Sequence, residues 1–403
     1  MAGIYVHIPF CRKFCTYCNF YSVGRLSLRN NFVDAICQEI SQQRKFFHEI
    51  APYGVAASES TVIDTLYFGG GTPSVLEPRM LERICNALRS NFNLEQLKEF
   101  TIELNPNDVT PGFAVFLKSL GVNRVSMGIQ SFDDAHLQWM NRRHNAAQAS
   151  EAFHILRAAG FSNISCDLIF GFPSLTGDSW EKSIRSLLDL HPEHISCYQM
   201  SVESGTALAR SLGKACDSSG NRVLEMPSQE ECASQYALLQ ELLSQAGYLQ
   251  YEISNFCLPG YHSRHNSAYW NNVPYLGLGP AAHSFNGVKR EWNVPVLQRY
   301  VKHYMYGEPS PVKEEETLTE KDLFNEMLML GLRQAKGLDW KELEKSCYYE
   351  LLKPDLQRLL KSGALVKFCT NAEKDGCAGK LRLRIPASRF FVSDNIIREL
   401  FIL

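Results

Sequence analysis

The sequence has almost no net charge and no long hydrophobic run. Among its 403 residues, 41 Lys and Arg oppose 43 Asp and Glu, which leaves a formal net charge of −2. This balance provides no general attraction to nucleic acid or to an anionic membrane surface. No stretch reaches the roughly 18 apolar residues of a membrane-spanning helix. The apolar stretch at the N-terminus is too short for a signal peptide and lacks a basic segment before it. We therefore expect no nucleic-acid partner, no membrane span and a cytoplasmic location.

The 13 cysteines do not suggest a disulfide framework. Their number is odd, the chain is long, and the N-terminus predicts no secretion. We therefore expect a reducing compartment. The scattered cysteines lie in apolar periodic segments, where such residues usually act as small core side chains. This group comprises Cys37, Cys85, Cys166, Cys197 and Cys232.

Short β-rich runs alternate with helical periodicity over the first 200 residues. Strands are predicted at 4–8, 62–68, 101–104, 124–129, 164–169 and 194–198. Helices are predicted at 28–50, 77–92, 111–120, 133–140, 146–159 and 179–190. This alternation is typical of an α/β protein with a parallel sheet and helical crossovers. The units visible in the sequence favour a partial (β/α)6 barrel, and ligands of such folds bind at the C-terminal ends of the strands.

The alternation fades after residue 200. A helix is predicted at 229–247, and residues 250–300 are aromatic and Asn-rich with little periodicity. The first domain, a barrel with its extension, is expected to span residues 1–305. Prolines and an acidic run predict an exposed linker over residues 306–318.

A small C-terminal domain is expected over residues 319–403. Helices are predicted at 319–333, 339–346 and 353–362, and a hairpin at 363–366 and 380–384. Three helices followed by a hairpin are typical of a winged-helix-like domain. A generic α-rich packing cap fits the same pattern, and a winged helix alone does not imply DNA binding.

Three cysteines follow the first predicted strand at short spacing, as Cys11-Arg-Lys-Phe-Cys15-Thr-Tyr-Cys18. A structural zinc site normally has four protein ligands, and no fourth cysteine lies close by. An iron–sulfur cluster held by three cysteines leaves one iron open to a small molecule. The alternative is a zinc site completed by a distant His or Cys.

Polar or glycine residues follow several of the predicted strands. Residues 69–72 read Gly-Gly-Gly-Thr, and glycines there allow backbone N–H groups to approach a ligand closely, although the turn could also be purely structural. A carboxylate suits ribose hydroxyls, and an arginine suits a carboxylate ligand. The candidates after the later strands are Glu103, Gln130, Arg142 and Asp167.

A histidine-containing aromatic segment lies in the aperiodic region. It reads His265-Asn266-Ser-Ala-Tyr269-Trp270, and His283 follows after a glycine-rich stretch. Aromatic faces around an imidazole could form a flat apolar cavity with one axial metal ligand, as haem requires. The alternative is that these histidines are hydrogen-bonded structural residues.

Together these segments resemble the radical S-adenosylmethionine (SAM) superfamily, and within it the oxygen-independent coproporphyrinogen III oxidase-like proteins, the HemN/HemW group. The resemblance runs from about residue 3 to the C-terminus. It implies a 4Fe–4S cluster on Cys11, Cys15 and Cys18, with SAM chelating the open iron. It also implies SAM contacts by Tyr5, Tyr17, Gly70, Gly71, Thr72, Glu103, Gln130, Arg142 and Asp167.

The resemblance further distinguishes two branches of this group. The oxidases carry an additional cysteine two residues after the third cluster cysteine, and this chain has Phe20 there. The sequence around Phe20 and the segment 265–270 resemble the haem chaperone branch, which links that segment to haem. His265, Tyr269, Trp270 and His283 are therefore the haem candidates.

The expected function is that of a chaperone that binds haem as cargo and transfers it to an unidentified haem-accepting protein. A reduced flavodoxin- or ferredoxin-like protein would supply electrons. The alternative is a coproporphyrinogen III dehydrogenase that decarboxylates two propionates in porphyrin biosynthesis. The chain resembles this enzyme but has Phe20 in place of the extra cysteine, so the sequence does not decide whether the protein is an enzyme.

Overall fold

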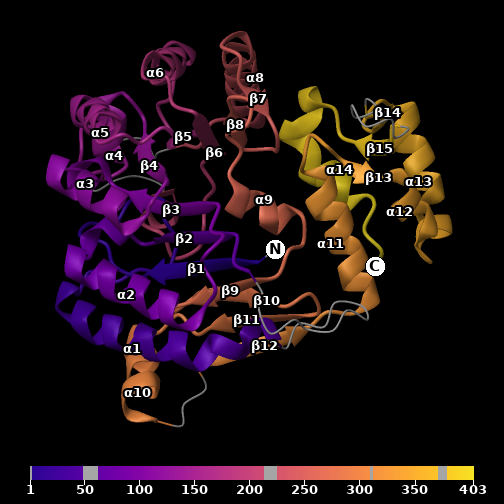
Figure 1. The fold of residues 1–403 in the computed structure, drawn as a ribbon. Coiled ribbons are helices and arrows are strands. Elements are labelled where there is room, and N and C mark those ends of the chain that lie inside the picture. The colour runs from indigo at the N-terminus through magenta and orange to yellow at the C-terminus, as the bar shows by residue number, and fades with distance from the viewer. Residues whose placement is uncertain (1, 49–61, 213–224, 309–311, 371–378) are drawn as a thin grey trace.

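The computed structural model describes residues 2–48, 62–212, 225–308, 312–370 and 379–403 (Figure 1). The end of the predicted helix 28–50 and residues 309–311 of the predicted linker lie outside this part. Within it, no helix has the length and hydropathy needed to cross a bilayer.

Six parallel strands form the centre of the molecule and lie side by side in chain order. They are β1 (Gly3–Ile8), β2 (Thr65–Gly70), β3 (Glu99–Leu104), β4 (Arg124–Gln130), β5 (Ile164–Phe170) and β6 (His194–Gln199). Figure 1 shows the connecting helices on the outer side of this sheet. These helices are α1 (Arg29–Gln42), α2 (Pro78–Asn91), α3 (Pro111–Leu120), α4 (Asp134–Trp139), α5 (Ala146–Ala158) and α6 (Gly177–Asp189). The predicted α/β architecture with six βα units is confirmed.

The two faces of the central strands differ in chemistry because successive side chains point to opposite sides. Along β1, Ile4, Val6 and Ile8 are fully buried in the apolar core. Tyr5 and His7 alternate with them and therefore face the inside of the barrel. The interior of an ordinary (β/α)8 barrel is filled with branched apolar residues. A polar inner face instead indicates a binding site.

Further strands extend the sheet at both edges, giving twelve strands in total among the described residues. β9 (Tyr275–Leu278) pairs parallel with β1, followed by β10 (His283–Phe285), β11 (Lys289–Asn293) and β12 (Lys313–Thr317), which are antiparallel. At the other edge lie β8 (Asn255–Cys257) and β7 (Leu249–Gln250). The helices between β6 and β12 in the chain are α7 (Ala207–Leu212), α8 (Gln229–Gln245), α9 (Arg264–Trp270) and α10 (Leu297–Tyr306).

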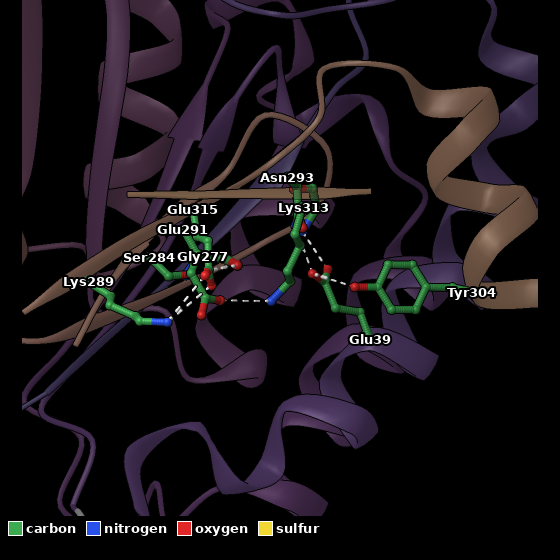
Figure 2. Close-up of polar contacts among 10 residues, drawn as sticks. Glu39, Gly277, Ser284, Lys289, Glu291, Asn293, Tyr304, Lys313 and Glu315 are labelled. Atoms are coloured by element: carbon green, nitrogen blue, oxygen red, sulfur yellow. Dashed lines mark hydrogen bonds and ion pairs between the residues drawn. The ribbon is translucent and has the colours of Figure 1, made fainter. Parts of the chain in front are cut away.

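The segment 306–318, predicted to be a linker, contains a strand. Residues 313–317 form β12, which pairs with β11 across its whole length. Most of its side chains are exposed, which explains why an acidic run without apolar alternation occurs in a strand. Backbone pairing and the cross-strand ion pairs of Lys289 with Glu315 and of Lys313 with Glu291 hold it to the sheet (Figure 2). The division of the chain at these boundaries into two domains stays a prediction.

A buried carboxylate joins α1 to the sheet extension (Figure 2). Glu39 accepts hydrogen bonds from the Gly279 backbone N–H and the Asn293 side-chain amide, both at 2.7 Å. The hydroxyls of Tyr300 and Tyr304 donate to it at 2.6 and 3.2 Å. Because a buried polar group is tolerated only with such partners, this cluster positions β9, β11 and α10 against the barrel.

The described residues of the C-terminal part form four α-helices and a small antiparallel sheet. The first three helices are α11 (Glu320–Leu332), α12 (Trp340–Lys345) and α13 (Tyr349–Lys361). The sheet has the order β13 (Leu338–Asp339), β15 (Leu381–Arg384) and β14 (Val366–Cys369), and α14 (Ser393–Arg398) follows it. The predicted hairpin is present, but its first strand begins at Val366 because Gly363, with φ of +69°, ends α13. This arrangement agrees with the winged-helix-like expectation.

Candidate functional site

One cavity of about 500 Å³ opens at the C-terminal ends of the parallel strands. It is lined by all of the predicted cluster and SAM residues except Tyr5: Cys11, Cys15, Tyr17, Cys18, Gly70, Gly71, Thr72, Glu103, Gln130, Arg142 and Asp167. These residues come from separate loops and strands, so only the fold brings them together. Tyr5 lies on the inner face of β1 but lines a different cavity. The individual role of each residue stays a prediction.

The three cysteines lie on the loop after β1, which is anchored to its neighbours. The Val23 N–H donates to Pro9 O at 2.7 Å, and the Asn141 side chain donates to Phe14 O at 2.6 Å. Cys11 Sγ lies 3.5 Å from the Thr72 hydroxyl, and Arg142 Nη1 donates to Cys15 Sγ at 3.3 Å. Burial raises the pKa of Cys18 to about 11, so binding a metal there must release a proton.

The three thiols at the cavity wall suit a 4Fe–4S cluster. In a 4Fe–4S cluster each thiolate binds a different iron, so the three sulfurs need not surround one point. The guanidinium of Arg142 supplies a positive charge beside them. Its Nε is buried and has no hydrogen-bond partner among the described residues, which leaves a donor for a bound ligand.

The turn after β2 forms a cradle that only glycine can form. Gly70 has φ of +106°, and a Cβ atom there would lie 2.6 Å from the His7 ring. A Cβ at Gly71 would lie 2.7 Å from Phe10 O. The Gly70 N–H donates to Glu103 Oε2 at 3.1 Å, and the Tyr67 hydroxyl donates to Oε1 at 2.8 Å. The glycines therefore place backbone groups and the Glu103 carboxylate at the cavity wall.

Two carboxylates face the cavity, and both have perturbed acidities. Burial raises the pKa of Glu103 to about 7. Burial also raises the pKa of Asp167 to about 6, although the Arg124 guanidinium and the Ser126 hydroxyl, 3.3 Å away, oppose the rise. At neutral pH Asp167 is therefore mostly ionised and Glu103 about half ionised, and the ionised carboxylates accept hydrogen bonds from hydroxyl or ammonium donors.

Gln130 has an unusual backbone. Its φ is +72°, and the pairing of β4 with β5 shifts register between Gly128 and Gln130. Such a bulge re-aims a side chain at a strand end. A non-glycine residue in the left-handed region is uncommon and clusters at functional sites.

Arg124 is a cavity residue that the sequence reasoning missed. It is 1% exposed and lines the cavity below the carboxylates, and its Nε has no hydrogen-bond partner among the described residues. The run from Arg124 through Ser126 and Gly128 to Gln130 alternates with Val125, Met127 and Ile129. That period-two pattern was the available signal for a polar inner face on β4.

The four haem candidates do not form one cluster. His265 is 1% exposed on the floor of the barrel, where its Nδ1 bonds the Thr65 hydroxyl and its Nε2 the Tyr269 hydroxyl, both at 2.9 Å. Burial lowers the pKa of His265 to about 3. Trp270 lines a cavity of about 530 Å³ next to the C-terminal part, and Tyr269 lines it too. His283 lies in a third cavity, which Tyr269 also lines. The geometry therefore favours His283 over His265 as an accessible ligand.

Comparisons with known proteins agree with this geometry. The sequence model of the Radical SAM superfamily matches residues 5–187. The haem chaperone HemW of Lactococcus lactis is 32% identical over 351 residues, which cover 86% of each chain. The haem chaperone HemW of Bacillus subtilis is 33% identical over 85% of this chain and 86% of that one. The solved structure of coproporphyrinogen III oxidase (HemN) from Escherichia coli, a radical SAM enzyme, has a TM-score of 0.77. It is 22% identical and covers 99% of this chain and 90% of that chain, so it shows a shared fold.

Membership in the superfamily implies a 4Fe–4S cluster and SAM, and the cysteines, glycine cradle and carboxylates described above fit both. The chain belongs to the radical SAM superfamily and, within it, to the family of the haem chaperone HemW.

Proposed function

We propose that this protein is a radical SAM haem chaperone, which binds haem and transfers it to haem proteins. The observation that supports it most is the cluster loop itself. Three thiols line the SAM-sized cavity, and the position at which the oxidases carry a further cysteine is Phe20, 69% exposed beside that cavity. A phenyl ring has no acidic proton and no affinity for metal, so it cannot replace a thiol in chemistry near the cluster.

In this proposal Cys11, Cys15 and Cys18 hold the cluster, and the open iron is left for SAM. When bound, the cluster and SAM supply one-electron chemistry at the SAM sulfonium. Gly70 and Gly71 let the backbone approach the ligand. Glu103 and Asp167 accept hydrogen bonds from its polar groups, and the unpaired Nε of Arg142 is available for its carboxylate.

The partners are a haem acceptor and an electron donor. A reduced flavodoxin- or ferredoxin-like protein is proposed as the donor, because the cluster loop lies at the mouth of the cavity with Phe14 and Phe20 exposed. Lys13 on the same loop offers positive charge to an acidic protein of that kind. The cytoplasmic location predicted from the sequence stays a prediction.

Two anaerobic measurements on the cluster-loaded protein test the proposal. Haem titration should give saturable binding with a Soret band. Incubation of the same preparation with coproporphyrinogen III, SAM and a reductant should give no protoporphyrinogen IX, measured by fluorescence after oxidation. Catalytic formation of that product would instead establish the coproporphyrinogen dehydrogenase alternative. Absence of haem binding would refute the chaperone proposal.

A further inference from the structure

A cavity of about 590 Å³ lies on the inner face of the sheet extension, beside the cluster loop. We call it the side cavity. Its walls are mostly aromatic or aliphatic, including Phe20, Tyr269, Tyr275, Phe285 and Leu330. The volume lies within the range of about 300–1,000 Å³ that cofactor pockets occupy. An apolar cavity of this size suits a large flat ligand.

His283 is an imidazole in the side cavity that is free to bind a metal. Its ring makes no hydrogen bond within the described part of the chain, and it stacks on Trp292 with ring centroids 5.7 Å apart and an interplanar angle of 24°. The stacking holds the ring orientation without using either nitrogen.

The backbone segments around His283 approach each other closely at two glycines. A Cβ atom at Gly277 would lie 2.0 Å from His283 O, and one at Gly279, where φ is +95°, would lie 2.5 Å from His7 O. Glycine at both positions therefore allows β9 and the turn after it to approach β10 on one side and β1 on the other. This explains the glycines that precede His283 in the sequence.

The other histidines near the side cavity are already engaged. His7 also lines it, but its Nε2 bonds Tyr21 O at 2.9 Å and its Nδ1 lies 3.2 Å from the Tyr5 hydroxyl. Both ring nitrogens of His265 are hydrogen-bonded on the barrel floor. Binding of a metal by either ring would first break a buried hydrogen bond, which costs about 1–3 kcal/mol. His283 carries no such cost.

Two further residues complete the chemistry that haem requires. Arg290 is the cationic side chain in the cavity wall, and its Nη1 pairs with Glu326 at 2.8 Å, which holds the guanidinium in place for a propionate. Phe20 lines both the side cavity and the cluster cavity. The residue at the position of the oxidase cysteine therefore borders both cavities.

We propose that the side cavity is the haem site, with the imidazole of His283 as the axial ligand and Arg290 as the partner of a haem propionate. This inference rests on the proposed haem-binding function and assigns its site. Haem would then lie next to the cluster loop, with the Phe20 ring between the two.

Haem titration of the cluster-loaded protein tests this assignment, with difference spectra taken against the haem-free protein. His283→Ala should weaken haem binding about tenfold or more and shift the Soret band, since loss of even an outer-shell partner of a metal ligand costs about 10–100-fold. Added imidazole should restore the spectrum. His283→Cys should bind haem with the Soret and electron paramagnetic resonance signature of a thiolate ligand. Only a residue that coordinates the iron changes the ligand type in this way.

His154→Ala is the matched control, because His154 is an exposed histidine on α5 that does not line the side cavity. It should leave the haem affinity and the spectrum unchanged.

Arg290→Gln should weaken the binding of haem more than that of haem dimethyl ester, and equal weakening would overturn the propionate assignment. If wild-type protein binds haem and both His283 variants keep its affinity and spectrum, the axial assignment is wrong while the proposed function stands. If wild-type protein binds no haem, the proposed function itself fails.

Discussion

The acidity of Glu103 should make SAM binding depend on pH. Its carboxylate lies at the cavity wall, held by Gly70 and Tyr67, and burial raises its pKa to about 7. Only the ionised form is a pure hydrogen-bond acceptor. The contribution of Glu103 to binding is therefore nearly complete at about pH 8 and is lost as the pH falls through 7. The contribution of Asp167, whose pKa is about 6, is also lost as the pH falls, about one unit lower.

The magnitude follows from these two values. If SAM binds only when both carboxylates are ionised, protonation at pH 6 raises the apparent Kd about 11-fold through Glu103 and about twofold through Asp167. Between pH 8 and pH 6 the wild-type Kd should thus rise about 20-fold, a change of about 1.8 kcal/mol. In Glu103→Gln the 11-fold factor disappears. The Kd of this variant should therefore rise only about twofold between pH 8 and pH 6, through Asp167.

Equilibrium dialysis of labelled SAM against the anaerobically reconstituted protein measures both Kd values. The visible absorbance of the cluster at each pH checks that the cluster is intact. The amino group of SAM also titrates in this range, but it does so equally in wild type and variant, so the comparison of the two isolates Glu103. An identical pH dependence in both proteins would refute the reasoning.

Three other changes test separate parts of the structure. Cys15→Ala should abolish the visible absorbance of the reconstituted cluster, whereas Cys166→Ala, at a buried core position away from the cavity, should retain it. Gly70→Ala should weaken SAM binding in dialysis by at least about 1 kcal/mol, because the φ of +106° strains any L-residue and the new Cβ would meet the His7 ring. Unaltered SAM affinity in this variant would show that the turn is not part of the pocket. Glu39→Ala should lower the free energy of unfolding by at least about 3 kcal/mol in chemical denaturation, because four buried donors lose their acceptor. A loss below about 1 kcal/mol would contradict the role assigned to this cluster.

Local sequence patterns predicted the central architecture well, for a physical reason. Helical and strand periodicities reflect which face of each element is buried, and six such units in a row dictate a parallel sheet. The same logic failed at β12, because an exposed edge strand buries too little apolar surface to produce an alternating pattern. It also missed the short strands β7 to β11, because segments of two to five residues carry too few positions for a period to appear.

The sequence by itself determined the cluster loop, because three cysteines within eight residues are close in space whatever the rest of the chain does. It also determined the glycine cradle and the absence of a thiol at Phe20. Only the tertiary structure decided which polar residues share the cavity, since Arg124 joins Glu103 and Asp167 through strand register rather than spacing. It also decided which histidine is available: His265 is held on both nitrogens by residues from β2 and α9, whereas His283 remains accessible. Hydrogen bonds between distant segments set these environments, and no local pattern encodes them.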